Sequence, residues 1–231
     1  MTARDPTLFV FATLIEAEPF LARLSVIELG AHPAALYAAT ARGCSRFLVL
    51  ICGMGPAAAS AALDGTIARY APRRVLNCGV AGSLSEALAI GEIRQISAVA
   101  DASSYVTPLN PATLAYLSAP HELITPLPRH VGRARLLSQA VPVFDPARRA
   151  VLSGRGDLID MEGAAVARLC RGRALPCGLI KVVSDHANDR ATLLGNLAHT
   201  SRRLADFLIY HLDTLLQPET AHDAQRSHTA C

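Results

Sequence analysis

The chain has 231 residues, of which 51% are hydrophobic and 18% are charged, a balance opposite to that of disordered proteins. Its 22 lysine and arginine residues barely exceed its 19 acidic residues and form no basic run, which argues against nucleic acid or an anionic membrane surface as a partner. The apolar run at 47–63 is interrupted by Gly53, Gly55 and Pro56 and falls short of the ~20 apolar residues that a membrane-spanning helix needs. Because Glu16 closely follows the first apolar segment, we expect no secretory signal and a cytoplasmic protein.

Strand-like and helix-like segments alternate along the chain. Short runs rich in Val, Ile and Phe predict buried strands at 8–12, 47–52, 75–78, 93–99 and 179–183. Longer alanine-rich stretches with helical spacing predict helices at 16–24, 56–70, 111–117, 162–170 and 190–216. This alternation predicts an α/β fold of three αβα layers, in which helices cover a twisted, mostly parallel central sheet.

One domain, residues 1–216, accounts for all of these segments, because no repeat or long linker divides them. The proline-containing region at 101–157 is expected to form loops and short helices. Residues 217–231 are polar and are expected to be a disordered tail.

The cysteines and histidines give no sign of a metal site. The six cysteines include no Cys-x-x-Cys pair, the eight histidines form no HExxH motif, and we expect reduced thiols. The segment from Gly53 to Ala58 fits the G-x-G-x-x-A pattern of dinucleotide-binding loops, but no acidic residue follows where the ribose would be bound. We therefore predict no cofactor.

Polar residues follow the predicted strands at one edge of the sheet, where open α/β sheets bind their ligands. Glu16 follows the first strand, Ser184 and Asp185 follow the last, and Glu162 begins a helix. Each acid also has a structural interpretation, because Glu16 and Glu162 suit the first turn of a helix and Asp185 suits an N-cap. Lys181 lies within a buried strand and needs an ionic partner or a path to solvent.

Four segments occur in an order that resembles the purine nucleoside phosphorylase and nucleosidase superfamily: CGMG at 52–55, NCGVAGSL at 77–84, DMEGAA at 160–165 and IKVVSD at 180–185. The resemblance covers residues 8–216 and is closest to methylthioadenosine/S-adenosylhomocysteine nucleosidases and futalosine hydrolase-like members. It implies a nucleoside phosphorylase-like fold, a small purine nucleoside as the bound molecule, and a homo-oligomer, most simply a dimer.

The resemblance also implies roles for individual residues. Glu16 matches the glutamate that positions the attacking water, with Glu18 as the alternative, and Asp185 matches the acid that protonates N7 of the leaving purine. Glu162 matches the carboxylate that holds the ribose hydroxyls, while Met161 packs on the sugar. The other candidate substrate-binding residues are Cys78, Gly79, Val143, Phe144, Lys181 and Ser184, with Tyr105 as a further candidate for stacking on the base.

These roles suit cleavage of an N-glycosidic bond, because the sugar builds up positive charge and the base leaves as an anion unless it is protonated. The predicted function is metal-free hydrolysis of a 5′-modified purine nucleoside of the methylthioadenosine, S-adenosylhomocysteine or futalosine type. Residues 13–16 and 75–79 lack the arginines that the phosphorylase branch typically carries there, which favours water as the nucleophile. The alternatives are phosphorolysis, including that of adenosylhopane-type substrates, and a non-catalytic nucleoside-binding module.

Overall fold

The structure is a computed structural model that describes residues 6–30, 34–41, 45–102, 121–124 and 126–217. Its strands are β1 (Thr7–Phe11), β2 (Ser25–Gly30), β3 (Ala35–Ala41), β4 (Ser45–Ile51), β5 (Arg74–Ser83), β6 (Ile93–Asp101), β7 (His121–Glu122), β8 (Arg133–Ser138), β9 (Leu158–Asp160) and β10 (Cys177–Asp185). Its helices are α1 (Leu14–Leu21), α2 (Pro56–Tyr70), α4 (Pro146–Ser153), α5 (Gly163–Gly172), α6 (Arg190–Tyr210) and α7 (Leu212–Leu216).

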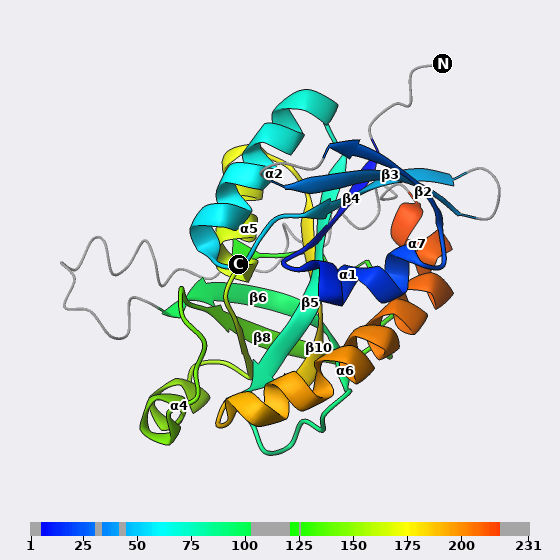
Figure 1. Cartoon of the computed structure of the whole chain (residues 1–231). Helices are drawn as coiled ribbons and strands as arrows, with labels where there is room; N and C mark the ends of the chain where they lie inside the picture. The colour runs from blue at the N-terminus through cyan, green and yellow to red at the C-terminus, as the bar shows by residue number, and fades with distance from the viewer. Residues whose placement is uncertain (1–5, 31–33, 42–44, 103–120, 125, 218–231) are drawn as a thin grey trace.

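The strands form one sheet that closes on itself at one end (Figure 1). Because β10 pairs with both β5 and β6, the strands β5, β10, β6, β8 and β9 make a closed ring. From β5 the sheet continues outward through β1, β4, β3 and β2, while β7 pairs with β6. Within the described residues, five strand pairings are parallel and five are antiparallel. The α/β class is therefore confirmed, but the prediction of a mostly parallel sheet is wrong.

Two of the antiparallel pairings, β2–β3 and β3–β4, have a physical cause in the short connections of the chain. β2, β3 and β4 follow one another with few residues between them, and strands joined by short turns can pair only in opposite directions. The sequence predicts β4 but neither β2 nor β3. Without these two strands, the first third of the chain has a strand–helix–strand pattern, which favours parallel pairing.

Helices cover the two faces of the sheet. On one face, α2 and α5 contribute Leu63 and Val166 to an apolar cluster that includes Val10 of β1. On the other face, α1 and α6 contribute Phe20 and Leu208 to a second cluster. None of the helices in the described ranges has the length and apolar character needed to cross a membrane.

The predicted elements agree with the structure along most of the chain. All five predicted strands are found, α2 covers the predicted 56–70, and the predicted helix at 190–216 is divided into α6 and α7. The region 101–157 contains α4 but also β7 and β8, which were not predicted, and the unpredicted β9 follows directly after it. The predicted helix at 111–117 lies outside the described residues, as does the predicted tail beyond residue 217.

Candidate active site

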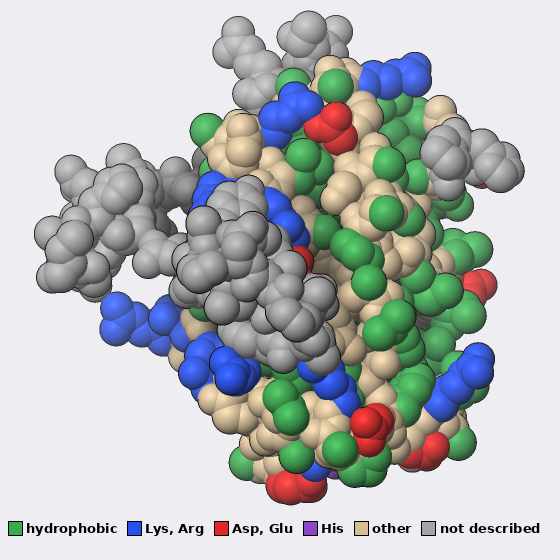
Figure 2. All heavy atoms as spheres, turned by 90° about the vertical axis from the view of Figure 1, so that its left-hand side faces the viewer, with side chains coloured by type: hydrophobic (Ala, Val, Ile, Leu, Met, Phe, Trp, Pro, Cys, Tyr) green, Lys and Arg blue, Asp and Glu red, His purple; other side chains and the backbone are tan. Residues whose placement is uncertain are grey.

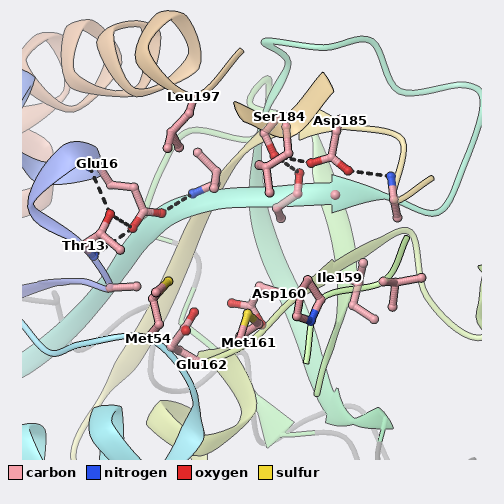
Figure 3. A pocket seen from close by; sticks show the side chains of 18 of the residues that line it. Thr13, Glu16, Met54, Ile159, Asp160, Met161, Glu162, Ser184, Asp185 and Leu197 are labelled. Carbon is pink, nitrogen blue, oxygen red and sulfur yellow. Dashed lines mark hydrogen bonds between the residues drawn. The ribbon is translucent and has the colours of Figure 1, made fainter. Parts of the chain in front are cut away.

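A cavity of about 210 Å³ lies where β1, β5, β9 and β10 end (Figure 3). Its charged side chains are the carboxylates of Glu16, Asp160, Glu162 and Asp185. Its apolar wall comes from Met54 after β4, from residues 142–144 before α4, and from three leucines of α6. Sequence segments that are far apart in the chain therefore meet at one edge of the sheet, as expected for an α/β protein.

Glu16 is fixed by the start of α1. Thr13 is the N-cap of this helix, and its Oγ1 accepts a hydrogen bond from the Glu16 amide at 3.4 Å, while the Thr13 amide donates to Glu16 Oε2 at 2.9 Å. The Thr13 hydroxyl donates to the same Oε2 at 2.8 Å, and the Val80 amide donates to Oε1 at 3.0 Å. Because a carboxylate offers about four acceptor positions, one position on Oε1 is left for a ligand.

Gly79 allows Glu16 to approach β5. A Cβ atom at residue 79 would lie 2.7 Å from Glu16 Oε1, closer than real Cβ contacts, and 3.7 Å from Lys181 Nζ. Any side chain at this position would therefore displace the Glu16 carboxylate from the Val80 amide.

Glu162 precedes α5, yet its side chain does not cap that helix. Instead its Oε1 accepts a hydrogen bond from the Gly55 amide at 2.6 Å, at the start of α2. Gly55 has a φ of 87°, which a residue with a Cβ rarely adopts. Burial, followed by the charge of Asp160, raises the pKa of Glu162 to about 7, although Lys181 and the Gly55 amide lower it.

Lys181 and Asp160 form a buried ion pair. Lys181 Nζ lies 2.8 Å from Asp160 Oδ2, and each side chain is only 2% exposed. Asp160 also accepts hydrogen bonds from the Ser138 hydroxyl and the Gly163 amide. Burial lowers the pKa of Lys181, but the charges of Asp160 and Glu162 raise it by more, so that it lies above its ordinary value. The ion pair thus supplies the partner that a lysine in a buried strand requires.

Asp185 ends β10 with both carboxylate oxygens hydrogen-bonded. The Ser184 hydroxyl donates to Oδ2 at 2.7 Å, and the Ala187 amide donates to Oδ1 at 2.6 Å. The N-cap of α6 is Asp189, whose side chain accepts from the amides of Ala191 and Thr192. The interpretation of Asp185 as the cap of this helix is therefore wrong, and its buried carboxyl group faces the cavity instead.

Most of the candidate residues from the sequence line the cavity: Glu16, Val143, Phe144, Met161, Glu162, Ser184 and Asp185. Gly79 and Lys181 lie just outside the lining, against Glu16 and Asp160. Cys78 points into the apolar cluster under α1 and α6, where burial raises its pKa to about 12. Glu18, the alternative to Glu16, is exposed on α1 and does not line the cavity, and Tyr105 lies outside the described residues.

Sequence reasoning missed the supporting residues Thr13, Gly55 and Asp160. The spacing of Thr13 and Glu16 is that of a capping box, so Thr13 could have been found from the sequence. The partner of Lys181 had to be an acid, but nothing local distinguished Asp160 from the others. Gly55 is 107 residues from Glu162 in the chain, and no sequence signal joins them.

The chemistry available at the cavity is hydrogen bonding and proton transfer by carboxyl groups. Within the part of the chain that the structure describes, no cluster of three or more His, Cys, Asp or Glu residues could hold a metal ion. The carboxylates of Glu16 and Glu162 both have free acceptor positions. In Figure 3 these two carboxylates lie toward one end of the cavity, and Asp185 lies toward the other end.

Comparisons with known proteins agree on the fold. The family model described as "Phosphorylase superfamily" matches residues 7–213. The 5′-methylthioadenosine/S-adenosylhomocysteine nucleosidase of Shewanella putrefaciens is 30% identical over 154 residues, which are 59% of this chain and 67% of that protein. The same enzyme from Shewanella sp. (strain MR-7) is 28% identical, and the match spans only 65% of its length.

Solved structures of low identity share the architecture over nearly the whole chain. The Arabidopsis thaliana 5′-methylthioadenosine nucleosidase superimposes with a TM-score of 0.82 at 20% identity, covering 93% of this chain and 97% of that one. The futalosine hydrolase of Helicobacter pylori gives a TM-score of 0.78 at 20% identity, covering 90% and 97%. At these identities the likeness shows the fold and not the substrate.

Proposed function

This chain belongs to the phosphorylase superfamily, and from that premise we propose that it hydrolyses the N-glycosidic bond of a 5′-modified purine nucleoside and releases the free base. The substrate is of the methylthioadenosine, S-adenosylhomocysteine or futalosine type. The names of the similar proteins support this class, since they are methylthioadenosine/S-adenosylhomocysteine nucleosidases and a futalosine hydrolase.

The charge of the cavity is the observation that carries the choice of water as nucleophile. In the described part of the lining, the ionisable side chains are Glu16, Asp160, Glu162 and Asp185, with no lysine, arginine or histidine among them. Phosphate is an anion that proteins hold with guanidinium, ammonium or several amide donors. The negative charges of these carboxylates would repel phosphate, whereas the same groups accept hydrogen bonds from neutral water and ribose.

The reaction follows from these positions. A water molecule at the free acceptor position of Glu16 attacks C1′ of the ribose and passes its proton to that carboxylate. The electron pair of the C–N bond moves into the purine, and Asp185 protonates N7 so that the base leaves uncharged. Glu162 accepts hydrogen bonds from the ribose hydroxyls and must be ionised to accept both. The Gly55 amide fixes its orientation.

The remaining candidates act around these groups. Met161 packs on the sugar, Val143 and Phe144 flank the base, and Ser184 orients the Asp185 carboxyl group through its hydrogen bond. Cys78 and Gly79 lie in β5 behind the cavity, where Gly79 leaves room for the Glu16 carboxylate, and Lys181 acts through Asp160 and Glu162 rather than on the substrate itself.

The test is base release from methylthioadenosine, S-adenosylhomocysteine, futalosine and adenosine, followed by chromatography in phosphate-free buffer. We expect release from at least one of the 5′-modified nucleosides without phosphate. Release only after phosphate is added would establish phosphorolysis instead. Binding of these nucleosides without release of base in either buffer would identify a binding module and refute an enzymatic function.

The organisation of the whole protein belongs to the same proposal. Residues 1–216 form one catalytic domain, of which the family match covers 7–213, and residues 217–231 are a polar tail. Met54 and Leu194, which line the cavity, are 68% and 57% exposed, which supports a homo-oligomer, most simply a dimer, that covers its mouth. The free thiols of the four described cysteines support a reducing compartment, the cytoplasm. The molar mass from light scattering, measured as the protein elutes from a size-exclusion column, tests the dimer.

A further inference from the structure

The segment between β8 and α4, residues 139–145, forms one wall of the cavity at the end where Asp185 lies. Its residues 142–144 line the cavity. Val143 is buried in a small apolar cluster with Ile159 and Ala187, which flank Asp185 on the neighbouring elements. Under the proposed function, on which this inference rests, a purine that places N7 at Asp185 lies against this segment, and we call its residues 140–145 the base loop.

Two polar side chains brace the base loop from behind. The Arg148 guanidinium, on α4, donates a hydrogen bond from Nη2 to Gln139 Oε1 at 2.8 Å. The Gln139 amide group in turn donates from Nε2 to the carbonyl oxygen of Val141 at 2.7 Å, inside the base loop. Arg148 Nη2 also reaches the carbonyl oxygen of Ala102, 3.4 Å away at the end of β6. Neither Gln139 nor Arg148 lines the cavity.

The brace also joins the base loop to the carboxylate segment. The Gln139 backbone amide donates to the carbonyl oxygen of Asp160 at 3.0 Å, and the Gln139 side chain is buried with only 8% of the residue exposed. Asp160 belongs to the stretch that also provides Met161 and Glu162. One glutamine therefore sets the base loop relative to the residues that hold the sugar.

A fixed loop matters for the choice of purine. Adenine and hypoxanthine differ at position 6, where one has an amino donor and the other a carbonyl acceptor, and correspondingly at N1. Peptide groups of a loop can distinguish the two only if they keep their direction, since a wrong base then leaves a buried polar group unpaired. A loop that can turn accepts either base and loses this discrimination.

We propose that Gln139 and Arg148 are positioning residues that hold the base loop in one arrangement and so determine which purine the site accepts. The brace makes no contact with substrate and takes no part in proton transfer. Its effect is on binding of the intact nucleoside and on the preference between bases, and not on the rate of the bond-breaking step.

The experiment compares 5′-methylthioadenosine with 5′-methylthioinosine as substrates of the full chain. For Arg148→Met we expect KM for the preferred nucleoside to rise about tenfold, the scale of one hydrogen bond from a charged group, with kcat within about threefold. The ratio of kcat/KM between the two nucleosides should fall by at least about fivefold. Gln139→Leu removes the same brace from its other side and should give the same change, and the double variant should add little to either single variant.

The matched control is Arg149→Met, on the same helix. Arg149 pairs with Glu86 at 2.7 Å, a carboxylate whose side chain is 78% exposed, and the pair does not touch Gln139. This variant should keep the wild-type base preference. Thermal melting of all variants shows whether they are folded, and Arg148→Lys, which keeps a cation, replaces Arg148→Met if the latter is not.

The outcomes separate this inference from the proposed function. If the wild type releases no base from these two nucleosides, from S-adenosylhomocysteine or from futalosine, the proposed function fails, and the base preference is then read from the dissociation constants of the two nucleosides by calorimetry. If the wild type releases base but Arg148→Met and Gln139→Leu keep its base preference, the inference is wrong while the function stands. Equal losses in kcat for both nucleosides would likewise show a merely structural role and overturn it.

Discussion

The Asp160–Lys181 ion pair offers a prediction whose sign differs between its two members. Lys181 lowers the pKa of Glu162, whereas Asp160 raises it. We therefore expect Lys181→Met to raise the pKa of Glu162 above its value of about 7, and Asp160→Asn to lower it. Because Glu162 must be ionised to accept hydrogen bonds from the ribose hydroxyls, kcat/KM falls as the pH drops through this pKa. The acid limb of the profile should move to higher pH in Lys181→Met and to lower pH in Asp160→Asn.

The size of the shift follows from the Coulomb energy of a nearby charge. At an effective dielectric constant of ~20, two unit charges ~4 Å apart interact by about 4 kcal/mol and two charges at twice that separation by about 2 kcal/mol, while one pKa unit corresponds to about 1.4 kcal/mol; we therefore expect a shift on the order of one pKa unit or more. The direction in Asp160→Asn holds even if Lys181 loses its proton there, because the effect of Asp160 on Glu162 is the larger of the two. Lys181→Met also leaves the buried Asp160 carboxylate without its ionic partner, which should cost about 3–5 kcal/mol of folding stability.

The assay is kcat/KM for base release between pH 5 and 9, at a temperature at which melting curves show both variants folded. Arg173→Met is the control, because it breaks an ion pair with Asp64 that is exposed and distant from the cavity. Its acid limb should stay where it is in the wild type. If the acid limb of Asp160→Asn moved to higher pH, or if neither acid limb moved, the electrostatic explanation of the Glu162 pKa would be refuted.

Three further changes test other parts of the site. Gly79→Ala should lower kcat by about 10²-fold or more while the protein stays folded, because the new Cβ displaces the Glu16 carboxylate. A kcat equal to that of the wild type would contradict this. Asp185→Asn should also lower kcat by about 10²–10⁴-fold. Asp189→Asn, which changes only the cap of α6, should keep kcat and lose little stability, because Asn caps helices almost as well as Asp; equal kcat in the two variants would refute the acid role of Asp185. Glu162→Gln should stabilise the fold increasingly as the pH rises from 5 to 8, because the raised pKa of Glu162 means that its ionised form destabilises the folded state. The free energy of unfolding, measured by denaturant melts, should rise by on the order of 2–3 kcal/mol at pH 8, and a rise seen only at low pH would contradict this reasoning.

Much of the fold could be predicted from the sequence because its strands and helices carry strong local signals. The buried strands β1 and β4 contain continuous apolar runs, and β10 is apolar on both sides of Lys181. Helix α2 begins at Pro56, a favourable first-turn residue. β3 was missed because its sequence, ALYAATA, is rich in alanine, which favours helices. β9 has only three residues and was too short to recognise.

The direction of strand pairing could not be predicted, because the closure of β10 onto both β5 and β6 is a long-range contact. The site shows the same division. Glu16, Glu162 and Asp185 stood at predicted strand or helix boundaries and could be found there. The groups that support the site, such as the Gly55 amide at Glu162 and the brace of Gln139 and Arg148 at the base loop, depend on which loops meet in space. The order of residues along the chain does not indicate these contacts.

In the proposed reaction water, and not phosphate, attacks the nucleoside, in a cavity whose described charged groups are all carboxylates. ³¹P NMR tests it most directly: the protein is given 5′-methylthioadenosine in phosphate buffer, and the phosphorus spectrum is followed while base release is measured in the same tube. We expect base to accumulate while inorganic phosphate remains the only phosphorus species. A sugar 1-phosphate resonance that grows in step with the released base would contradict it.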